Sequence, residues 1–260
     1  MIEGSEPAPG RDAVWARAQR LIGALTLAAT VLLLLPAAAA ADRAARPHGS
    51  VVVSNERTST SWAHPVAKAP IRRSPRADAP SITQTHFETE DGFPEVYLVL
   101  RRWDDRGGRT WFKVRIPMRP NGKQGWVRDA ALGPLYRVRT QLVVDRSKQR
   151  ATLRRSGRKI WTAPVGIGAP DTPTPKGNFW IREKFKTSDS GGVYGPRAFG
   201  TSDYSVLTDW PGGGVIGIHG TNEPGLIPGR PSHGCIRVRN GEVRRLYRLM
   251  PVGTPLLIRE

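Results

Sequence analysis

Two short stretches, Val215-Ile216-Gly217-Ile218-His219-Gly220 and Ser232-His233-Gly234-Cys235-Ile236-Arg237, decide the fold and the chemistry that we expect of this chain. The second stretch contains the only cysteine among 260 residues, so no internal disulfide can form. In the first stretch, an apolar run leads directly into His219, sixteen residues before Cys235. A thiol beside an imidazole can act as a nucleophile, because the imidazole takes the thiol proton. The two stretches therefore predict one reactive site, provided that folding brings the two side chains together.

The residues around the cysteine suit a site that stabilises negative charge. His233 and Gly234 precede Cys235, and a glycine there lets the backbone bend tightly and expose its N–H groups. Such N–H groups can form an oxyanion hole for a tetrahedral intermediate. Arg237 follows two residues later, so in an extended segment its side chain shares a face with the thiol. A guanidinium in that place can bind a substrate carboxylate.

Two other interpretations of these residues stay open. His219, His233 and Cys235 could bind zinc with water as the fourth ligand, although no further cysteine or acidic residue stands at a typical ligand spacing. A single cysteine can also be a small buried apolar residue without any chemistry. The combination of the three side chains with glycine-rich segments favours nucleophilic chemistry over both.

Composition and apolar patterning favour strands over helices, so we expect a mainly β protein. The chain has 28 glycines and 23 prolines, which favour turns. From residue 135 onward, Tyr136, Val138, Leu142 and Val144 fall on one face of an extended segment. The segments 152–154 and 159–161 follow after short turns, which predicts consecutive hairpins, and 179–181 and 215–218 are later segments typical of strands. Residues 243–250 give the one expected short helix.

An upstream region, residues 66–134, has its own set of short strands. We expect strands at 96–100, 111–116 and 125–127, separated by turn clusters at 104–108 and 119–122. This pattern resembles a bacterial SH3-like barrel. Such a domain could bind the cell wall, or it could be a packing or spacer domain without a ligand, and the sequence leaves both open.

The N-terminal segment has the plan of an export signal. Within residues 1–41, three arginines precede an uncharged apolar run from Leu21 to Leu35, and Pro36 with five alanines follows it. A membrane span needs about 20 apolar residues, so we favour a cleaved signal peptide over a membrane anchor. Residues 42–65 are rich in Ser, Thr, Arg, Ala and Pro, which predicts a flexible tether. We therefore expect an exported protein of the cell envelope, with contact to the membrane only if the leader is retained.

The chain carries a formal net charge of +18, which predicts attraction to a polyanion. It contains neither zinc-finger spacing nor an RNA-recognition signature, so we do not expect nucleic acid as a partner. An acidic cell-wall polymer fits better with an exported protein.

Residues 136–260 resemble the L,D-transpeptidase catalytic (YkuD) domain family. The resemblance is carried by His219, by Ser232-His233-Gly234-Cys235 after a loop, and by the segment from Ile236 to Asn240. It implies a β-sandwich after the SH3-like barrel, with the site in a groove. It implies Cys235 as nucleophile and His219 as general base and acid. It also implies that His233 and Gly234, together with Cys235, form the oxyanion hole and its surroundings. Ser232 would brace the loop, Arg237 would contact the substrate, and the carbonyl of Gly220 would orient the base.

The same resemblance implies a reaction on peptidoglycan stem peptides. The thiol would attack a carbonyl of a donor tetrapeptide, release D-alanine and form a thioester, which an acceptor amine would then resolve into a cross-link. This route needs no metal ion or other cofactor. A carboxypeptidase or endopeptidase of the same fold, in which water resolves the thioester, is one alternative. A non-catalytic wall-binding protein is the other.

Overall fold

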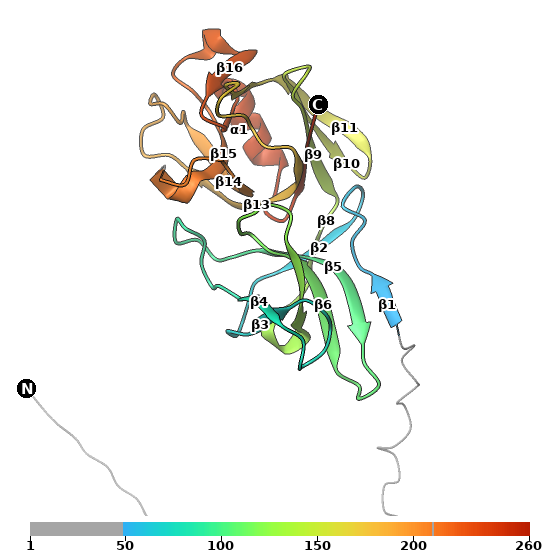
Figure 1. The fold of residues 1–260 in the computed structure, drawn as a ribbon. Helices are drawn as coiled ribbons and strands as arrows, with labels where there is room; N and C mark the ends of the chain where they lie inside the picture. The colour runs from blue at the N-terminus through green and yellow to red at the C-terminus, as the bar shows by residue number, and fades with distance from the viewer. Residues whose placement is uncertain (1–48, 210) are drawn as a thin grey trace, which may run out of the picture. The chain divides into compact units, whose positions relative to one another are not determined.

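The computed structural model describes residues 49–209 and 211–260, and these residues form two β-sheets (Figure 1). The protein is mainly β, as its glycine and proline content predicts. The expected signal peptide or anchor at 1–41 and the first part of the expected tether lie outside the described residues. Among the described residues, no helix has the length and apolar character that a membrane crossing requires.

The first sheet has eight strands in the order β4-β3-β7-β6-β5-β2-β8, with β1 also paired to β5. The strands are β1 (Gly49–Val52), β2 (Thr60–Ala63), β3 (Pro70–Arg72), β4 (Ser81–Gln84), β5 (Tyr97–Asp104), β6 (Thr110–Arg115), β7 (Gln124–Arg128) and β8 (Tyr136–Val138). A 3-10 turn, η1 (Asp129–Ala131), follows β7. The three strands predicted in this region are confirmed as β5, β6 and β7. Val99, Val114 and Val127, one from each of them, are fully buried in one core. The likeness to an SH3-like barrel stays a prediction.

The expected tether is wrong for the residues that the structure describes. Strand β2 is buried along its whole length and pairs with both β5 and β8. The polar composition of residues 42–65 did not indicate a buried strand, because short hydroxyl side chains can be buried once they are hydrogen-bonded. Ser54 shows how, since its Oγ donates to the carbonyl of Val99 and accepts from the N–H of Ser61, at 2.5 and 2.8 Å.

The boundary between the two β regions lies a few residues later than expected. Tyr136 and Val138, assigned from sequence to the downstream domain, lie in β8 of the first sheet, opposite Trp62 and Thr60 of β2. The rings of Tyr136 and Trp62 stack with centroids 4.7 Å apart. Leu142 and Val144 of the same apolar pattern lie in β9 of the second sheet. A pattern with a period of two does not reveal where the chain leaves one sheet for another.

The second sheet has ten strands in the order β11-β10-β9-β18-β13-β14-β15-β17-β12-β16. The strands are β9 (Thr140–Asp145), β10 (Arg150–Arg155), β11 (Arg158–Pro164), β12 (Gly166–Gly168), β13 (Gly177–Lys186), β14 (Arg197–Tyr204), β15 (Val215–His219), β16 (Gly229–Ser232), β17 (Ile236–Arg237) and β18 (Pro255–Arg259). The predicted hairpins are confirmed as β9, β10 and β11. Two 3-10 turns, η2 (Pro211–Gly214) and η3 (Pro224–Leu226), lie before β15 and before β16.

The predicted helix is confirmed as α1 (Asn240–Leu249), which starts three residues before the expected position. Val243 and Leu246 are fully buried and join the core of the second sheet, where α1 contacts β14 (Figure 1). The same core contains Ile218 and Ile236 from β15 and β17. The helix therefore anchors the two strands that bear the candidate site.

The two sheets meet over a small buried cluster within one compact unit, Ala45–Glu260. Trp62, Val96, Leu98 and Val138 from the first sheet region pack there against Trp180 of β13. The indole N–H of Trp180 donates to the carbonyl of Val96 at 2.7 Å.

A buried ion pair lies beside this cluster. The guanidinium of Arg182 on β13 pairs with the carboxylates of Glu90 and Glu95, and the side chains of Arg182 and Glu95 are 3% and 1% exposed. Arg182 Nε also donates to Glu95 Oε1 at 2.8 Å. Each sheet region thus supplies one partner of a charge pair that water does not reach.

Replacing Arg182 by methionine should destabilise the whole described unit. The substitution leaves the buried carboxylate of Glu95 without its counter-charge, which costs about 3–5 kcal/mol in comparable pairs. Urea denaturation followed by tryptophan fluorescence measures the free energy of unfolding. As a matched control, Arg76→Met removes an exposed pair with Asp78 and should leave the unfolding midpoint unchanged. Equal unfolding midpoints for the two variants would contradict this account of the junction.

Candidate active site

Parallel pairing of β15 and β17 brings His219 and Cys235 together. Ile218 pairs with Ile236 and His219 with Arg237, so Cys235 lies at the start of the partner strand. The N–H of Gly217 on β15 donates to the Cys235 sulfur at 3.4 Å. A methyl group on Gly217 would lie 3.7 Å from Cδ2 of His219 and 3.8 Å from that sulfur. The two side chains therefore flank the same glycine.

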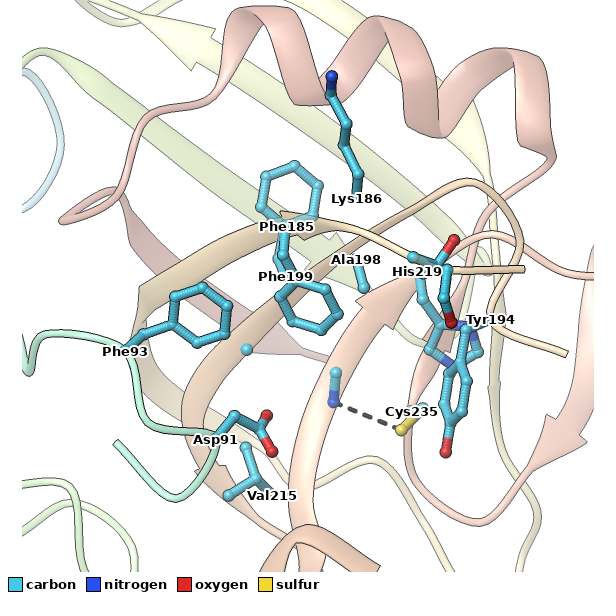
Figure 2. A pocket seen from close by; sticks show the side chains of 14 residues that line it. Asp91, Phe93, Phe185, Lys186, Tyr194, Ala198, Phe199, Val215, His219 and Cys235 are labelled. Carbon is cyan, nitrogen blue, oxygen red and sulfur yellow. Dashed lines mark hydrogen bonds between the residues drawn. The ribbon is translucent and has the colours of Figure 1, made fainter. Parts of the chain in front are cut away.

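The thiol and the imidazole open into one cavity of about 610 Å³ (Figure 2). Both residues also line a neighbouring cavity of about 250 Å³, together with Ser232, His233 and Arg237. Cys235 is half-buried, and its sulfur is therefore not sealed inside an apolar interior. The structure thus places the two residues singled out from the sequence where a small molecule can reach them.

The imidazole of His219 is held in one orientation. Its Nδ1 lies 2.6 Å from the carbonyl oxygen of Gly220, and because a carbonyl only accepts, Nδ1 carries the proton and Nε2 is left as the acceptor. The ring of Tyr194 packs edge-on against it at 4.9 Å between centroids. A side chain at Gly220 would collide with Gly195 and Pro196, which come within 2.9 Å of its Cβ position. Gly220 therefore both orients the imidazole and allows the close approach behind it.

Burial keeps both groups of this pair neutral at rest. The pKa of His219 is lowered to about 4, mainly by desolvation and also by the charge of Arg237, against the opposing effect of the Gly220 carbonyl. Desolvation also raises the pKa of Cys235, while the N–H of Gly217 and the charge of Arg237 act in the opposite direction. At neutral pH the site therefore holds a thiol and a neutral imidazole, and not a thiolate–imidazolium pair.

The turn that carries the cysteine is fixed by hydroxyl groups. Ser232 Oγ donates to the carbonyl of Cys235 at 2.6 Å, and Thr174 Oγ1 donates to the carbonyl of Gly234 at 2.6 Å. Gly234 has φ of 122°, a conformation that only glycine adopts readily. Its N–H donates to Ser232 Oγ at 3.3 Å, so its expected part in an oxyanion hole stays a prediction.

Arg237 lies beside the thiol on the second cavity, as expected for a residue two positions away in an extended segment. Its Nη1 donates to Glu223 at 2.7 Å. Its Nε is buried and has no hydrogen-bond partner in the described part of the chain. His233 is exposed at the rim of the same cavity. The zinc alternative receives no support, since no three His, Cys, Asp or Glu side chains within 49–209 and 211–260 are arranged to hold a metal ion.

One wall of the larger cavity was not predicted from the sequence. Asp91 and Phe93 line it from a loop between β4 and β5, closed by a bridge between Glu88 and Pro94 (Figure 2). The ring of Phe93 stacks on Phe185 of β13 with centroids 5.5 Å apart. The only sequence signal was an aromatic residue within a polar Asp-Gly-Phe-Pro turn.

A buried carboxyl lies behind this wall. Thr89 Oγ1 donates to Glu183 at 2.5 Å, and desolvation together with the nearby Asp91 carboxylate raises the pKa of Glu183 to about 7. The first sheet region thus contributes both shape and charge to the cavity.

Replacing Gly217 by alanine should protect the thiol without unfolding the protein. The new methyl would make only ordinary contacts, the closest being 3.5 Å from the carbonyl of Phe199, yet it would lie between the imidazole and the sulfur. We expect the rate of Cys235 alkylation by iodoacetamide to fall about tenfold. Gly241→Ala, on open helix surface, is the control and should alkylate at the wild-type rate. An unchanged alkylation rate in Gly217→Ala at wild-type Tm would show that the two side chains do not flank this position.

The pH dependence of alkylation should report a neutral resting pair. Because burial raises the thiol pKa, the midpoint should lie above the value of about 8.5 of a free thiol. Because the pKa of His219 is about 4, the profile should have no inflection from this imidazole between pH 5 and 8. Alkylation rates measured from pH 5 to 10 beside N-acetylcysteine test both points. A midpoint below that of N-acetylcysteine would mean that the thiolate is the resting form.

Three comparisons with known proteins bear on this site. The model of the L,D-transpeptidase catalytic domain family YkuD matches residues 139–258. YkuD of Bacillus subtilis is 31% identical over 123 residues, which cover 47% of this chain and 68% of that protein. L,D-transpeptidase 1 of Mycobacterium tuberculosis is 25% identical over 201 residues, or 72% of this chain and 71% of that protein. Among solved structures, the catalytic domain of the E. faecium L,D-transpeptidase is 25% identical and covers 46% of this chain and 96% of that chain, with a TM-score of 0.35. The protein therefore belongs to the L,D-transpeptidase catalytic domain (YkuD) family.

Proposed function

We propose that this protein is a peptidoglycan L,D-transpeptidase that cross-links stem peptides through a thioester on Cys235. The observation that carries the proposal is the meeting of the Cys235 thiol and the His219 imidazole at one cavity of about 610 Å³. That volume is within the range of sites that bind small ligands or short peptide segments. The family to which the chain belongs supports the choice of acyl transfer over other cysteine chemistry.

The first half-reaction forms the thioester and releases D-alanine. Nε2 of His219 takes the thiol proton as Cys235 Sγ attacks the carbonyl carbon of a donor tetrapeptide, and the carbonyl oxygen becomes an oxyanion. When the tetrahedral intermediate collapses, the C–N bond to D-alanine breaks and the imidazolium gives its proton to the leaving amine. The Gly220 carbonyl supports this cycle, because it accepts from Nδ1–H and stabilises the transient imidazolium.

The second half-reaction returns the enzyme to its neutral resting state. An acceptor amine attacks the thioester carbonyl, His219 takes a proton from the attacking nitrogen, and the C–S bond breaks. The imidazolium then protonates the departing sulfur, so that a new amide and the original thiol remain. Since the imidazole is neutral and the sulfur uncharged, as thiol or thioester, before and after each half-reaction, the buried site holds a separated charge pair only while a tetrahedral intermediate exists.

Substrate binding is assigned to the residues around the pair. Arg237 lines the smaller cavity and its charge suits a carboxylate of the stem peptide. Ser232 braces the cysteine turn, and the backbone of His233, Gly234 and Cys235 is the proposed source of oxyanion contacts. The stacked pair of Phe93 and Phe185 offers an apolar wall to the aliphatic part of a peptide.

The rest of the chain suggests where this reaction takes place. The apolar N-terminal run supports export to the cell envelope, either as a cleaved leader or as an anchor. The net charge of +18 supports attraction to an acidic wall polymer, with the first sheet as an SH3-like candidate for that contact.

The experiment is a transfer assay with the purified protein, a tetrapeptide donor and an amine acceptor. Mass spectrometry should detect the joined product, free D-alanine and a transient adduct on Cys235. Cys235→Ala should abolish all three, while Cys235→Ser, which keeps the size but weakens the nucleophile, should lose at least about a thousandfold in rate. Trimmed tripeptide without joined product would favour the hydrolase alternative. Full transfer activity in Cys235→Ala would refute the proposal.

A further inference from the structure

A loop of the first sheet region holds the end of strand β14 in the second sheet. Asn121, between β6 and β7, donates from Nδ2 to Asp203 Oδ1 at 2.8 Å and to the carbonyl of Tyr204 at 2.9 Å. Its Oδ1 accepts from the N–H of Tyr204 at 3.1 Å. One side chain thus satisfies both backbone groups of Tyr204 and one oxygen of a buried carboxyl. Three hydrogen bonds from a single residue fix this strand end in position and in orientation.

Arg119, from the same loop, holds the segment that follows. Its Nη2 donates to the carbonyls of Ser205 and Leu207 at 3.2 and 3.0 Å. Its guanidinium lies over the ring of Tyr204, 4.7 Å from the centroid. The loop therefore contacts residues 203–207 as a continuous run.

Strand β14 needs such support at this point because its pairing with β15 is irregular. The register shifts between Gly200 and Tyr204, so residues 201–203 do not have regular ladder partners on β15. The Thr201 hydroxyl replaces part of the ladder by donating to the carbonyl of Ile216 at 2.7 Å. The Asn121 amide bonds the backbone of Tyr204, where the pairing with β15 resumes, from outside the sheet.

Residues 201–207 are linked by two routes to the turn that carries Cys235. Ser205 Oγ lies 3.4 Å from the carbonyl of His233. Thr201 accepts from the N–H of Asp203 at 3.1 Å and bonds Ile216, whose neighbour Gly217 donates to the Cys235 sulfur. Both routes begin within three residues of the Asn121 contacts and end on the residues that define the thiol position.

Asp203 itself lies within electrostatic reach of the thiol. Its side chain is fully buried, and within the described residues its Oδ2 has no hydrogen-bond partner. Desolvation raises its pKa well above the usual range, and its charge, when present, raises the pKa of Cys235. The groups that act on the sulfur are therefore the Gly217 N–H, Arg237 and Asp203, and the first sheet region bonds directly to the last of them.

We propose that Asn121 is a positioning residue for Cys235: by holding Asp203 and the backbone of Tyr204, it sets the placement of the cysteine turn and the reactivity of its thiol. This inference rests on the proposed role of Cys235 as the nucleophile. It makes the first sheet region part of the reactive site, in addition to any wall contact of its own.

The test compares Asn121→Ala with Asn55→Ala in the full chain. Asn55 is a matched control, because it also organises a loop of the first sheet region, through four hydrogen bonds to residues 57–59, and none of these four bonds reaches the second sheet. Two readouts are taken for each variant, together with Tm. One is the pH profile of Cys235 alkylation by iodoacetamide, which needs no substrate, and the other is kcat and KM in the transfer assay.

We expect Asn121→Ala to lower kcat about tenfold with little change in KM, and to move the alkylation midpoint to higher pH. The alkylation midpoint should rise because a displaced turn weakens the contact with the Gly217 N–H, which stabilises the thiolate of Cys235. Asn55→Ala should keep the wild-type profile and kcat. A wild-type alkylation profile and kcat in Asn121→Ala would overturn the proposal, whatever the change in Tm.

Variants at Asp203 keep the test decisive if Asn121→Ala is poorly stable. Asp203→Asn keeps an oxygen that can accept from Asn121 and removes the charge that raises the pKa of Cys235, so its alkylation midpoint should not rise above the wild-type value. Asp203→Ala also loses the hydrogen bond to Asn121, so its midpoint should lie above that of Asp203→Asn. The shift caused by Asn121→Ala should be smaller in the Asp203→Ala background than in the wild type, because one of its three hydrogen bonds is already absent there. Equal shifts in the two backgrounds would overturn the proposal. If Cys235→Ala kept transfer activity, the proposed function would fail, but the alkylation profiles would still decide whether Asn121 positions the thiol.

Discussion

The parallel pairing of β15 with β17 is the constraint on which the site depends. Two parallel strands cannot be joined by a tight turn, and their connection needs a dozen residues or more. The sixteen residues 220–235 between β15 and β17 are this connection, and they include β16 and the 3-10 turn η3. The spacing of the two reactive residues is therefore a consequence of sheet topology. Any change that displaced one strand, such as loss of the buried Ile218–Ile236 pair, would separate the imidazole of His219 from the thiol of Cys235.

Burial has opposite effects on the two pKa values of this pair, and both effects favour the neutral form. An exposed thiol and imidazole would each have a significant charged fraction near neutral pH, whereas here the pKa of the imidazole falls to about 4 and that of the thiol rises. The charge of Arg237 favours the thiolate but disfavours the imidazolium, so it does not by itself create an ion pair. In the proposed reaction, proton transfer would be coupled to attack on a bound carbonyl, because only the oxyanion and its donors offset the cost of the buried charge.

The sequence was sufficient for the residues whose chemistry is local and insufficient for those placed by distant segments. Cys235, His219 and the glycines around them were recognisable because a lone thiol, an imidazole after an apolar strand and tight turns leave a local pattern. The prediction of a flexible tether was wrong at β2, because a sequence does not distinguish buried from exposed serine and threonine until their hydrogen-bond partners are known. Asp91, Phe93 and Asn121 were missed for the same reason, since each acquires its role from residues about 80 or more positions away in the chain.

The junction between the two sheets makes the upstream region part of the same folded unit as the segment that matches the family. The junction buries Trp62, Leu98 and Trp180 and pairs Arg182 with two glutamates, so the two sheet regions cannot separate without a cost in free energy. Cutting the chain near residue 139 would expose the apolar cluster to water and leave a buried guanidinium without its carboxylates. The segment that matches the family, residues 139–258, therefore lacks partners that its own interior requires. Since Asp91 and Phe93 of the cavity wall and Asn121 beside β14 come from the same upstream region, the folded unit and the cavity both extend beyond the family segment.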